Sequence, residues 1–194
     1  MSIMHKEMFG INETLAKEIL EVALSTGGDF AEVYMEKTTN EVLRLHSGKL
    51  STANVSKVKG AAIRIIKGEL EVNSSITDCT YENLLKAAKT LAGSFNDKKH
   101  VEVQPFVEKK VELVVNPKNV RGNDISREVN LLKTASDTIY AYSKEIVQVI
   151  CNLTKMEKRI FVFASDSTWQ TDYRCNTRLS CQAVASDGKE METG

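Results

Sequence analysis

The spacing of hydrophobic residues predicts a helix near the start of the chain. Within residues 11–26, apolar side chains recur every four positions, at Ile11, Leu15 and Ile19, and charged residues occupy the opposite side. Asn12 suits the N-cap, and the pair Gly27-Gly28 is typical of a helix stop. The stretch is short and acidic, which favours packing onto a sheet over lying on a membrane surface.

Two further stretches show the same helical spacing. One carries Tyr81, Leu84, Ala88 and Leu91 on one face and follows two capping candidates, Asp78 and Thr80. The other runs from about Asp124 to Tyr142, with Asp124 and Ser126 both suited to its N-terminus. The pattern therefore predicts three helices.

A period of two predicts the strands. In the first half, alternating or apolar runs are separated by turns too short for a crossover, such as Ser47-Gly48-Lys49 and Lys67-Gly68-Glu69, so the strands must be antiparallel. These runs are 31–36, 43–46, 50–59, 61–66 and 70–75. Three more strands are expected in the second half: 146–153, the apolar run 160–164, and one that begins at Trp169–Arg174 and alternates up to Ala185.

This order of elements predicts an α+β fold. An antiparallel meander sheet covered by helices is followed by a helix and a second antiparallel strand group. The expected organisation is an N-terminal α+β domain at 1–93, a linker at 94–122, and a helix with antiparallel strands at 123–194. The linker holds both prolines and two short apolar pieces at 101–107 and 111–115. The last part is interpreted as the start of a larger domain that the chain does not complete.

Composition and charge exclude some function classes. The 194 residues carry 26 basic and 26 acidic side chains, and this zero net charge argues against a nucleic-acid binder, which needs a basic excess. No apolar run approaches the ~20 residues of a membrane-spanning helix, and the N-terminus lacks a signal-peptide core. The four cysteines form no C-x-x-C pair. We expect a cytoplasmic protein with reduced thiols that binds neither nucleic acid nor membrane.

No catalytic, cofactor-binding or metal-ligating residue can be assigned from the sequence. His5, His46 and His100 are too far apart to share a helix face as in H-E-x-x-H, and no phosphate-binding glycine loop or G-x-S-x-G elbow occurs. Cys175 and Cys181, with His46 brought near by the fold, could form a metal site. Their spacing is wider than in known zinc sites, and Cys181 is in phase with apolar neighbours, which favours a small core residue.

Two other candidates also have simpler explanations. His46 next to Ser47 suggests a base and a nucleophile, but such pairs are defined by geometry in space, and a histidine at the end of a hairpin is usually solvated. Basic residues along one stretch could line a strand face, but without interleaved aromatic residues they favour protection of a sheet edge over nucleic-acid binding. These basic residues are Lys57, Lys59, Arg64 and Lys67.

The segments, in their order, resemble the TldD/PmbA family. In the first half the similarity lies in Asp29–Tyr34, in Ser47–Leu50 and in the G-x-x-x-R strand of Lys59–Ile66. In the second half it lies in Phe163–Asp166 and Asp172–Arg174, nearer the TldD than the PmbA branch. The resemblance covers nearly the whole chain and rests on order and spacing more than on any single motif.

The resemblance implies a cytoplasmic zinc metallopeptidase, in a family once described as modulators of DNA gyrase. TldD-type members bind zinc through H-E-x-x-x-H and a later cysteine, and act on extended or unfolded peptides inside a dimer. No position here matches that motif. We therefore expect an inactive N-terminal fragment of a zinc peptidase that forms a homodimer or pairs with a family paralogue. The alternatives are a PmbA-type partner subunit without metal, and an independent α+β module that binds peptide by strand addition.

Overall fold

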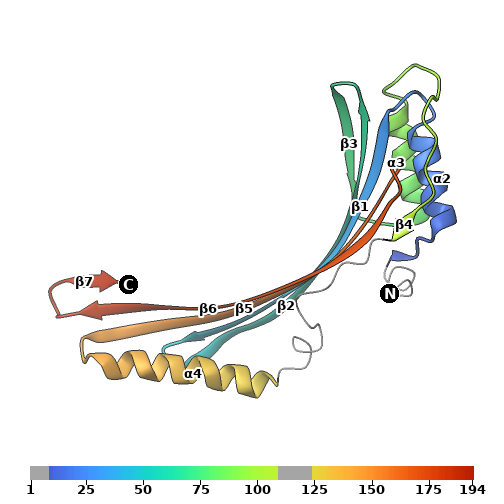
Figure 1. Ribbon diagram of the computed structural model, residues 1–194. Coiled ribbons are helices and arrows are strands. Elements are labelled where there is room, and N and C mark those ends of the chain that lie inside the picture. The colour runs from blue at the N-terminus through green and yellow to red at the C-terminus, as the bar shows by residue number, and fades with distance from the viewer. Residues whose placement is uncertain (1–8, 109–123) are drawn as a thin grey trace. The chain divides into compact units, whose positions relative to one another are not determined.

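The computed structural model describes residues 9–108 and 124–194 (Figure 1). In these residues a seven-stranded, mostly antiparallel sheet is accompanied by three helices, which confirms the predicted α+β class. The sheet has the order β3-β2-β1-β5-β6-β4, and β7 pairs with β6. The helices are α2 (Glu13–Ala23), α3 (Tyr81–Ala92) and α4 (Ile125–Tyr142). The strands are β1 (Phe30–His46), β2 (Lys49–Lys67), β3 (Leu70–Ile76), β4 (Val107–Glu108), β5 (Ile146–Ala164), β6 (Thr168–Ser186) and β7 (Met191–Thr193).

The chain divides into two compact units that alternate along the sequence. Unit 1 comprises Met1–Thr38, Val58–Glu112 and Arg159–Tyr173, and unit 2 comprises Thr39–Lys57, Leu113–Lys158 and Arg174–Gly194. Each of the four long strands β1, β2, β5 and β6 therefore contributes residues to both units. The predicted boundaries at 1–93, 94–122 and 123–194 stay a prediction.

Unit 1 packs the helices α2 and α3 against each other and against strands (Figure 1). Both helices begin as predicted: the Asn12 side chain accepts a hydrogen bond from Leu15 N–H at 3.0 Å, and Thr80 caps α3. The core beneath them includes an aromatic group in which Phe161 contacts Phe163 and Trp169, with ring centroids 5.3 and 4.7 Å away. Burial of these rings adds to the stabilisation that the aliphatic side chains of the same core provide.

In the described part of unit 2 there is one helix, α4, and a smaller apolar core. Asp124 caps α4 as predicted, accepting a hydrogen bond from Ser126 N–H at 2.9 Å. Leu132 of the helix packs on Leu45 of β1 and on neighbouring residues of β5. The strands β1 and β5 run antiparallel, because Ser165 N–H donates to Ala31 at the start of β1 and Ser47 N–H donates to Val149 near its end.

The structure corrects the predicted strand boundaries. The expected separate strands 50–59 and 61–66 are one strand, β2, which passes through Gly60 without a break. Likewise 146–153 and 160–164 are both part of β5. A Cβ atom added at Gly60 would meet nothing closer than the Ile76 carbonyl oxygen at 3.6 Å. The strand therefore does not need a glycine at this position for lack of space. Polar side chains between the apolar runs do not end a strand, because strand pairing is made by the backbone.

The predicted linker contributes to unit 1. Phe95 and Val103 are buried in its core, and Phe106 lies against Trp169 with ring centroids 4.8 Å apart. The short strand β4 pairs in parallel with the start of β6, Val107 opposite Thr168. The expected apolar piece at 111–115 lies outside the described residues.

Candidate functional site

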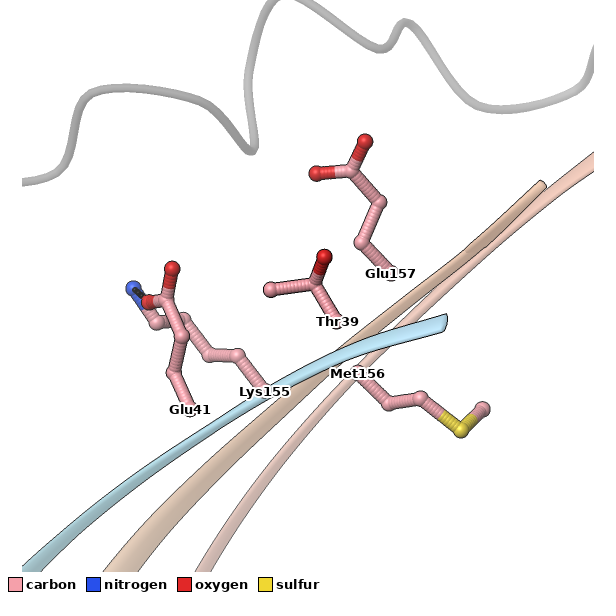
Figure 2. Close-up of a pocket in the computed structure, with 5 residues that line it drawn as sticks. All are labelled: Thr39, Glu41, Lys155, Met156 and Glu157. Carbon is pink, nitrogen blue, oxygen red and sulfur yellow. Dashed lines mark ion pairs between the residues drawn. The ribbon is translucent and has the colours of Figure 1, made fainter. Parts of the chain in front are cut away.

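A small pocket in unit 2 surrounds the amine of Lys155 (Figure 2). Lys155 Nζ lies 2.6 Å from Glu41 Oε2 and 2.7 Å from Glu128 Oε1. The side chains of Lys155 and Glu128 are only 12% and 7% exposed, whereas that of Glu41 is 42% exposed. Thr39, Met156 and Glu157 complete the lining, and the cavity holds about 20 Å³, which is enough for one water molecule.

Strand register and the start of α4 place these charges together. Counted along β1 and β5 from the hydrogen bond between Ser47 and Val149, Glu41 lies opposite Lys155. Figure 2 shows that Thr39 and Glu157 point to the same side as this pair, whereas Met156 points away, as alternation along a strand requires. Glu128 comes from the first turn of α4, where the helix dipole favours a negative charge.

The charges of this cluster keep the Lys155 amine protonated and in one position. Burial by itself would lower the pKa of Lys155, but its hydrogen bonds to Glu128 and Glu41 outweigh burial and raise that pKa above its usual value. The amine stays protonated and is held by two carboxylates, so it has no free electron pair for nucleophilic chemistry. The arrangement ties α4 to the strands β1 and β5.

A wider polar groove lies in unit 1 between the end of β3 and α3. It encloses about 350 Å³ and is open to solvent. Its polar lining includes Thr77, Asp78, Asn83 and Lys86, and the Asn83 amide donates to Asp78 Oδ2 at 2.9 Å. Among the strands of residues 9–108 and 124–194, β3 is the last in the sheet order, and its backbone pairs there with β2 alone. A groove beside an edge strand suits an extended peptide.

A third polar feature, which also lies in unit 1, joins His100 to the turn that follows β2. His100 Nε2 lies 2.7 Å from Asp29 Oδ1, and Asp29 Oδ2 accepts a hydrogen bond from Gly68 N–H at 2.6 Å. The Gly68 amide and the His100 ring lower the pKa of Asp29, and the hydrogen bond to Asp29 raises the pKa of His100. Both side chains are about half exposed. The pair fastens the segment around residue 100 to the Lys67–Leu70 turn.

The structure does not bring the candidate residues of the sequence together as one site. His46 is exposed at the end of β1, and Ser47 has a left-handed backbone (φ 48°) in the turn that follows. Cys181 is exposed, so its interpretation as a core residue was wrong. It faces Cys151 of β5, with the two sulfur atoms 2.7 Å apart. The sequence gives no sign of this pair, because the two residues are thirty positions apart.

Three of the four basic residues singled out in the first half, Lys59, Arg64 and Lys67, contact other side chains. Arg64 Nη2 lies 2.9 Å from Glu32 Oε1, and Lys67 Nζ lies 3.0 Å from Asp97 Oδ2. Lys59 Nζ lies 5.5 Å from the centre of the Phe9 ring. These contacts make the three side chains part of unit 1, whereas Lys57 is exposed and belongs to unit 2.

The described residues do not provide a metal site. Across 9–108 and 124–194, no three or more His, Cys, Asp or Glu side chains are grouped so that they could hold a metal ion. None of the helices in these same ranges is long and apolar enough to cross a membrane.

Comparison with protein families gives two adjacent matches. The model described as PmbA/TldA metallopeptidase domain 1 matches residues 31–94, and that described as the PmbA/TldA metallopeptidase central domain matches residues 118–194. No curated protein matches the sequence.

Solved structures share the fold at low sequence identity. A protein described as a modulator of DNA gyrase, from Bacteroides thetaiotaomicron, is 14% identical with a TM-score of 0.72, and the match covers 94% of this chain and 43% of that one. A second protein so described, from Thermotoga maritima, is 17% identical with a TM-score of 0.68, covering 94% and 41%. TldE from Thermococcus kodakarensis is 14% identical with a TM-score of 0.57, covering 91% and 40%. The chain thus spans less than half the length of each of these proteins.

Proposed function

Because the chain belongs to the TldD/PmbA family, we propose that it forms the N-terminal part of a TldD-type, zinc-dependent metallopeptidase that acts on extended or unfolded peptides. The observation that carries this proposal is the match of two consecutive domain models of that family, at residues 31–94 and 118–194. The two matches follow one another in the order of their names, first domain and then central domain. The peptidase chemistry belongs to the longer protein, since this chain spans only 40–43% of the solved structures that share its fold.

Zinc would be bound by residues outside the described part of the chain. The donor set of 9–108 and 124–194 does not fit a zinc centre, because no group of three suitable side chains converges there. The Lys155 cluster is equally unsuited, since its two carboxylates already hold an ammonium group. The role proposed for this chain is to shape the path of the substrate, without a part in bond cleavage.

The groove beside β3 supports a peptide as the substrate class. An edge strand offers backbone donors and acceptors in the spacing that an extended peptide requires. The adjoining groove adds the side chains of Asn83 and Lys86, which can bind the carbonyl groups or carboxylates of such a peptide. A folded protein has few free strand edges to offer, so this mode of binding favours unfolded substrates.

A PmbA-type subunit that carries no metal is the second candidate. It is supported by the match to TldE beside the two gyrase-modulator structures, because a fold shared at 14–17% identity is compatible with both branches. In that case the chain would contribute substrate-binding surface to a heterodimer with a catalytic paralogue. For the first candidate we also propose a dimer, and we propose that it is located in the cytoplasm. Light scattering of the longer protein measures the mass of the assembly and tests the dimer.

The experiment that separates the two candidates begins with the gene. The reading frame beyond Gly194 is translated and searched for H-E-x-x-x-H, and the encoded protein is purified and its zinc content measured. The peptidase proposal expects the motif and one equivalent of zinc, lost when both histidines are replaced by alanine. A continuous reading frame without the motif, in a protein that binds no zinc, overturns that proposal and supports the partner subunit. The 194-residue chain alone is the control and is expected to bind no stoichiometric zinc.

A further inference from the structure

Cys151 and Cys181 face each other across the β5–β6 hairpin, in the parts of these two strands that belong to unit 2. The strands β5 and β6 are hydrogen-bonded neighbours joined by the short turn at 165–167, and the two cysteines lie equally far from that turn. Their sulfur atoms are 2.7 Å apart. Directly opposed residues of an antiparallel pair have Cα atoms ~4.5–5.5 Å apart, which is within the range that a disulfide spans. Closing the bond requires the sulfur atoms to approach by only about 0.7 Å.

The two thiols have different surroundings. Cys151 is fully buried in the apolar core of unit 2, among Leu45, Leu132 and Val149. Cys181 is exposed on β6. Burial, together with the neighbouring Cys181 sulfur, raises the pKa of Cys151 to about 12. A reagent in solution therefore reaches Cys181 first, and Cys151 is protected from it except through Cys181.

We propose that Cys151 and Cys181 are a redox modification site. The two thiols form a reversible intramolecular disulfide when a small-molecule disulfide, such as oxidised glutathione, oxidises them. The Cys181 thiolate attacks one sulfur of the small disulfide, forms a mixed disulfide and releases one thiol. The Cys151 sulfur, having given its proton to solvent, then attacks the Cys181 sulfur and expels the second thiol. The small disulfide is reduced to two thiols, and the two cysteines are oxidised to one disulfide.

The bond would fasten neighbouring strands of unit 2. It closes a loop of about thirty residues that contains most of β5, the turn at 165–167 and most of β6. Because the strands are already paired there, the disulfide restricts the unfolded chain and leaves the fold unchanged. The oxidised protein is expected to unfold at a temperature roughly 5 °C higher than the reduced protein.

The test uses the whole 194-residue chain and oxidised glutathione as the reagent. After incubation at pH 8, two of the four thiols should be lost, and digestion without reductant should yield one cross-linked peptide pair that contains Cys151 and Cys181. Dithiothreitol should restore both thiols and remove the gain in unfolding temperature. A Cys79→Ser, Cys175→Ser double variant keeps the pair and should give the same cross-link.

The single variant Cys151→Ser provides the second arm. Cys181 should then stop at the mixed disulfide with glutathione, because no resolving thiol is present, and the increase in unfolding temperature should be absent. The proposal is overturned if the wild-type chain accumulates the same glutathione adduct on Cys181 with Cys151 still a thiol. It is also overturned if the cross-link joins Cys181 to Cys175 or to Cys79.

Discussion

The two units of this chain are stabilised by different means, although they share four strands. Unit 1 buries a large apolar core in which two helices and a group of aromatic rings around Phe161 pack against strands. Unit 2, as far as its residues are described, has the helix α4 and a small core, and Glu128 of that helix forms a buried ion pair with Lys155. Apolar burial tolerates small shifts, whereas a buried ion pair stabilises only when each partner is in place. Unit 2 should therefore be the more sensitive to loss of one polar group.

The largest effect is expected from the core of unit 1. Replacing Phe161, which is fully buried between Phe163 and Trp169, by alanine should lower the free energy of unfolding by about 3–5 kcal/mol because it leaves a cavity. Urea denaturation measures this loss. Leu70→Ala is the control, since Leu70 is 65% exposed on β3 and its truncation should change stability by less than about 0.5 kcal/mol. Equal losses in the two variants would contradict the core assignment.

A smaller effect is expected at Lys155. Lys155→Met leaves the Glu128 carboxylate buried without its cation and should cost about 2–3 kcal/mol, less than the ~3–5 kcal/mol of a fully buried pair because the Lys155 side chain is 12% exposed. Adding Glu128→Gln removes the unpaired charge and should restore part of the loss. The matched variant in unit 1 is Lys67→Met, whose partner Asp97 is 58% exposed, so less than about 1 kcal/mol should be lost. If Lys67→Met proves as costly as Lys155→Met, the contrast between the units fails.

Two glycines of unit 1, Gly28 and Gly60, should differ in how their replacement by alanine changes stability. A Cβ atom at Gly28 would lie 2.7 Å from Ile65 Cγ2, so Gly28→Ala should destabilise by about 1–3 kcal/mol through overpacking. Gly60→Ala meets no such contact within β2, and should be neutral or stabilising by up to about 0.5 kcal/mol. Thermal unfolding of both variants checks this. A large loss of stability in Gly60→Ala would contradict the description of β2 as one strand that runs through residue 60 without a break.

The smallest effect concerns pH and the pair of His100 and Asp29. The raised pKa of His100 means that its contribution to stability is complete below its ordinary value of 6.5 and is lost as the pH rises through the folded value. The lowered pKa of Asp29 means that its contribution is present above 3.8 and is lost as the pH falls through its lower folded value. NMR titration should find the His100 midpoint above 6.5 in the wild type. In Asp29→Asn the midpoint should fall, and an unchanged midpoint would show that the contact is absent.

Local patterns in the sequence predict the helices well. Asn12, Thr80 and Asp124 cap α2, α3 and α4 as the sequence indicates, because a cap is decided by residues within one turn. The antiparallel arrangement follows from short turns for the same reason. The lengths of the strands were not predictable in this way. Gly60 and the polar residues between the apolar runs of β5 are typical of loops, and pairing with the neighbouring strands of the sheet keeps them extended.

The polar groups that the structure brings together depend on strand register. Glu41 and Lys155 face each other because β1 pairs with β5, and nothing near either residue specifies that pairing. The burial of Glu128 could be predicted in part, because Glu128 lies one turn before the buried Leu132 on the inner face of α4. Cys151 could be predicted as buried from its alternation in β5, but its contact with Cys181 required the hairpin register. Distant pairs of this kind are what a single sequence does not reveal.

The central proposal is that this chain is the substrate-shaping part of a zinc peptidase. The most direct measurement is hydrolysis of an unfolded protein, such as reduced and alkylated casein, by the longer protein that contains residues 1–194 and the sequence that follows. The account predicts cleavage that a chelator abolishes and added zinc restores, with no cleavage of a tightly folded control protein. A longer protein that holds one equivalent of zinc and cleaves neither substrate would contradict it.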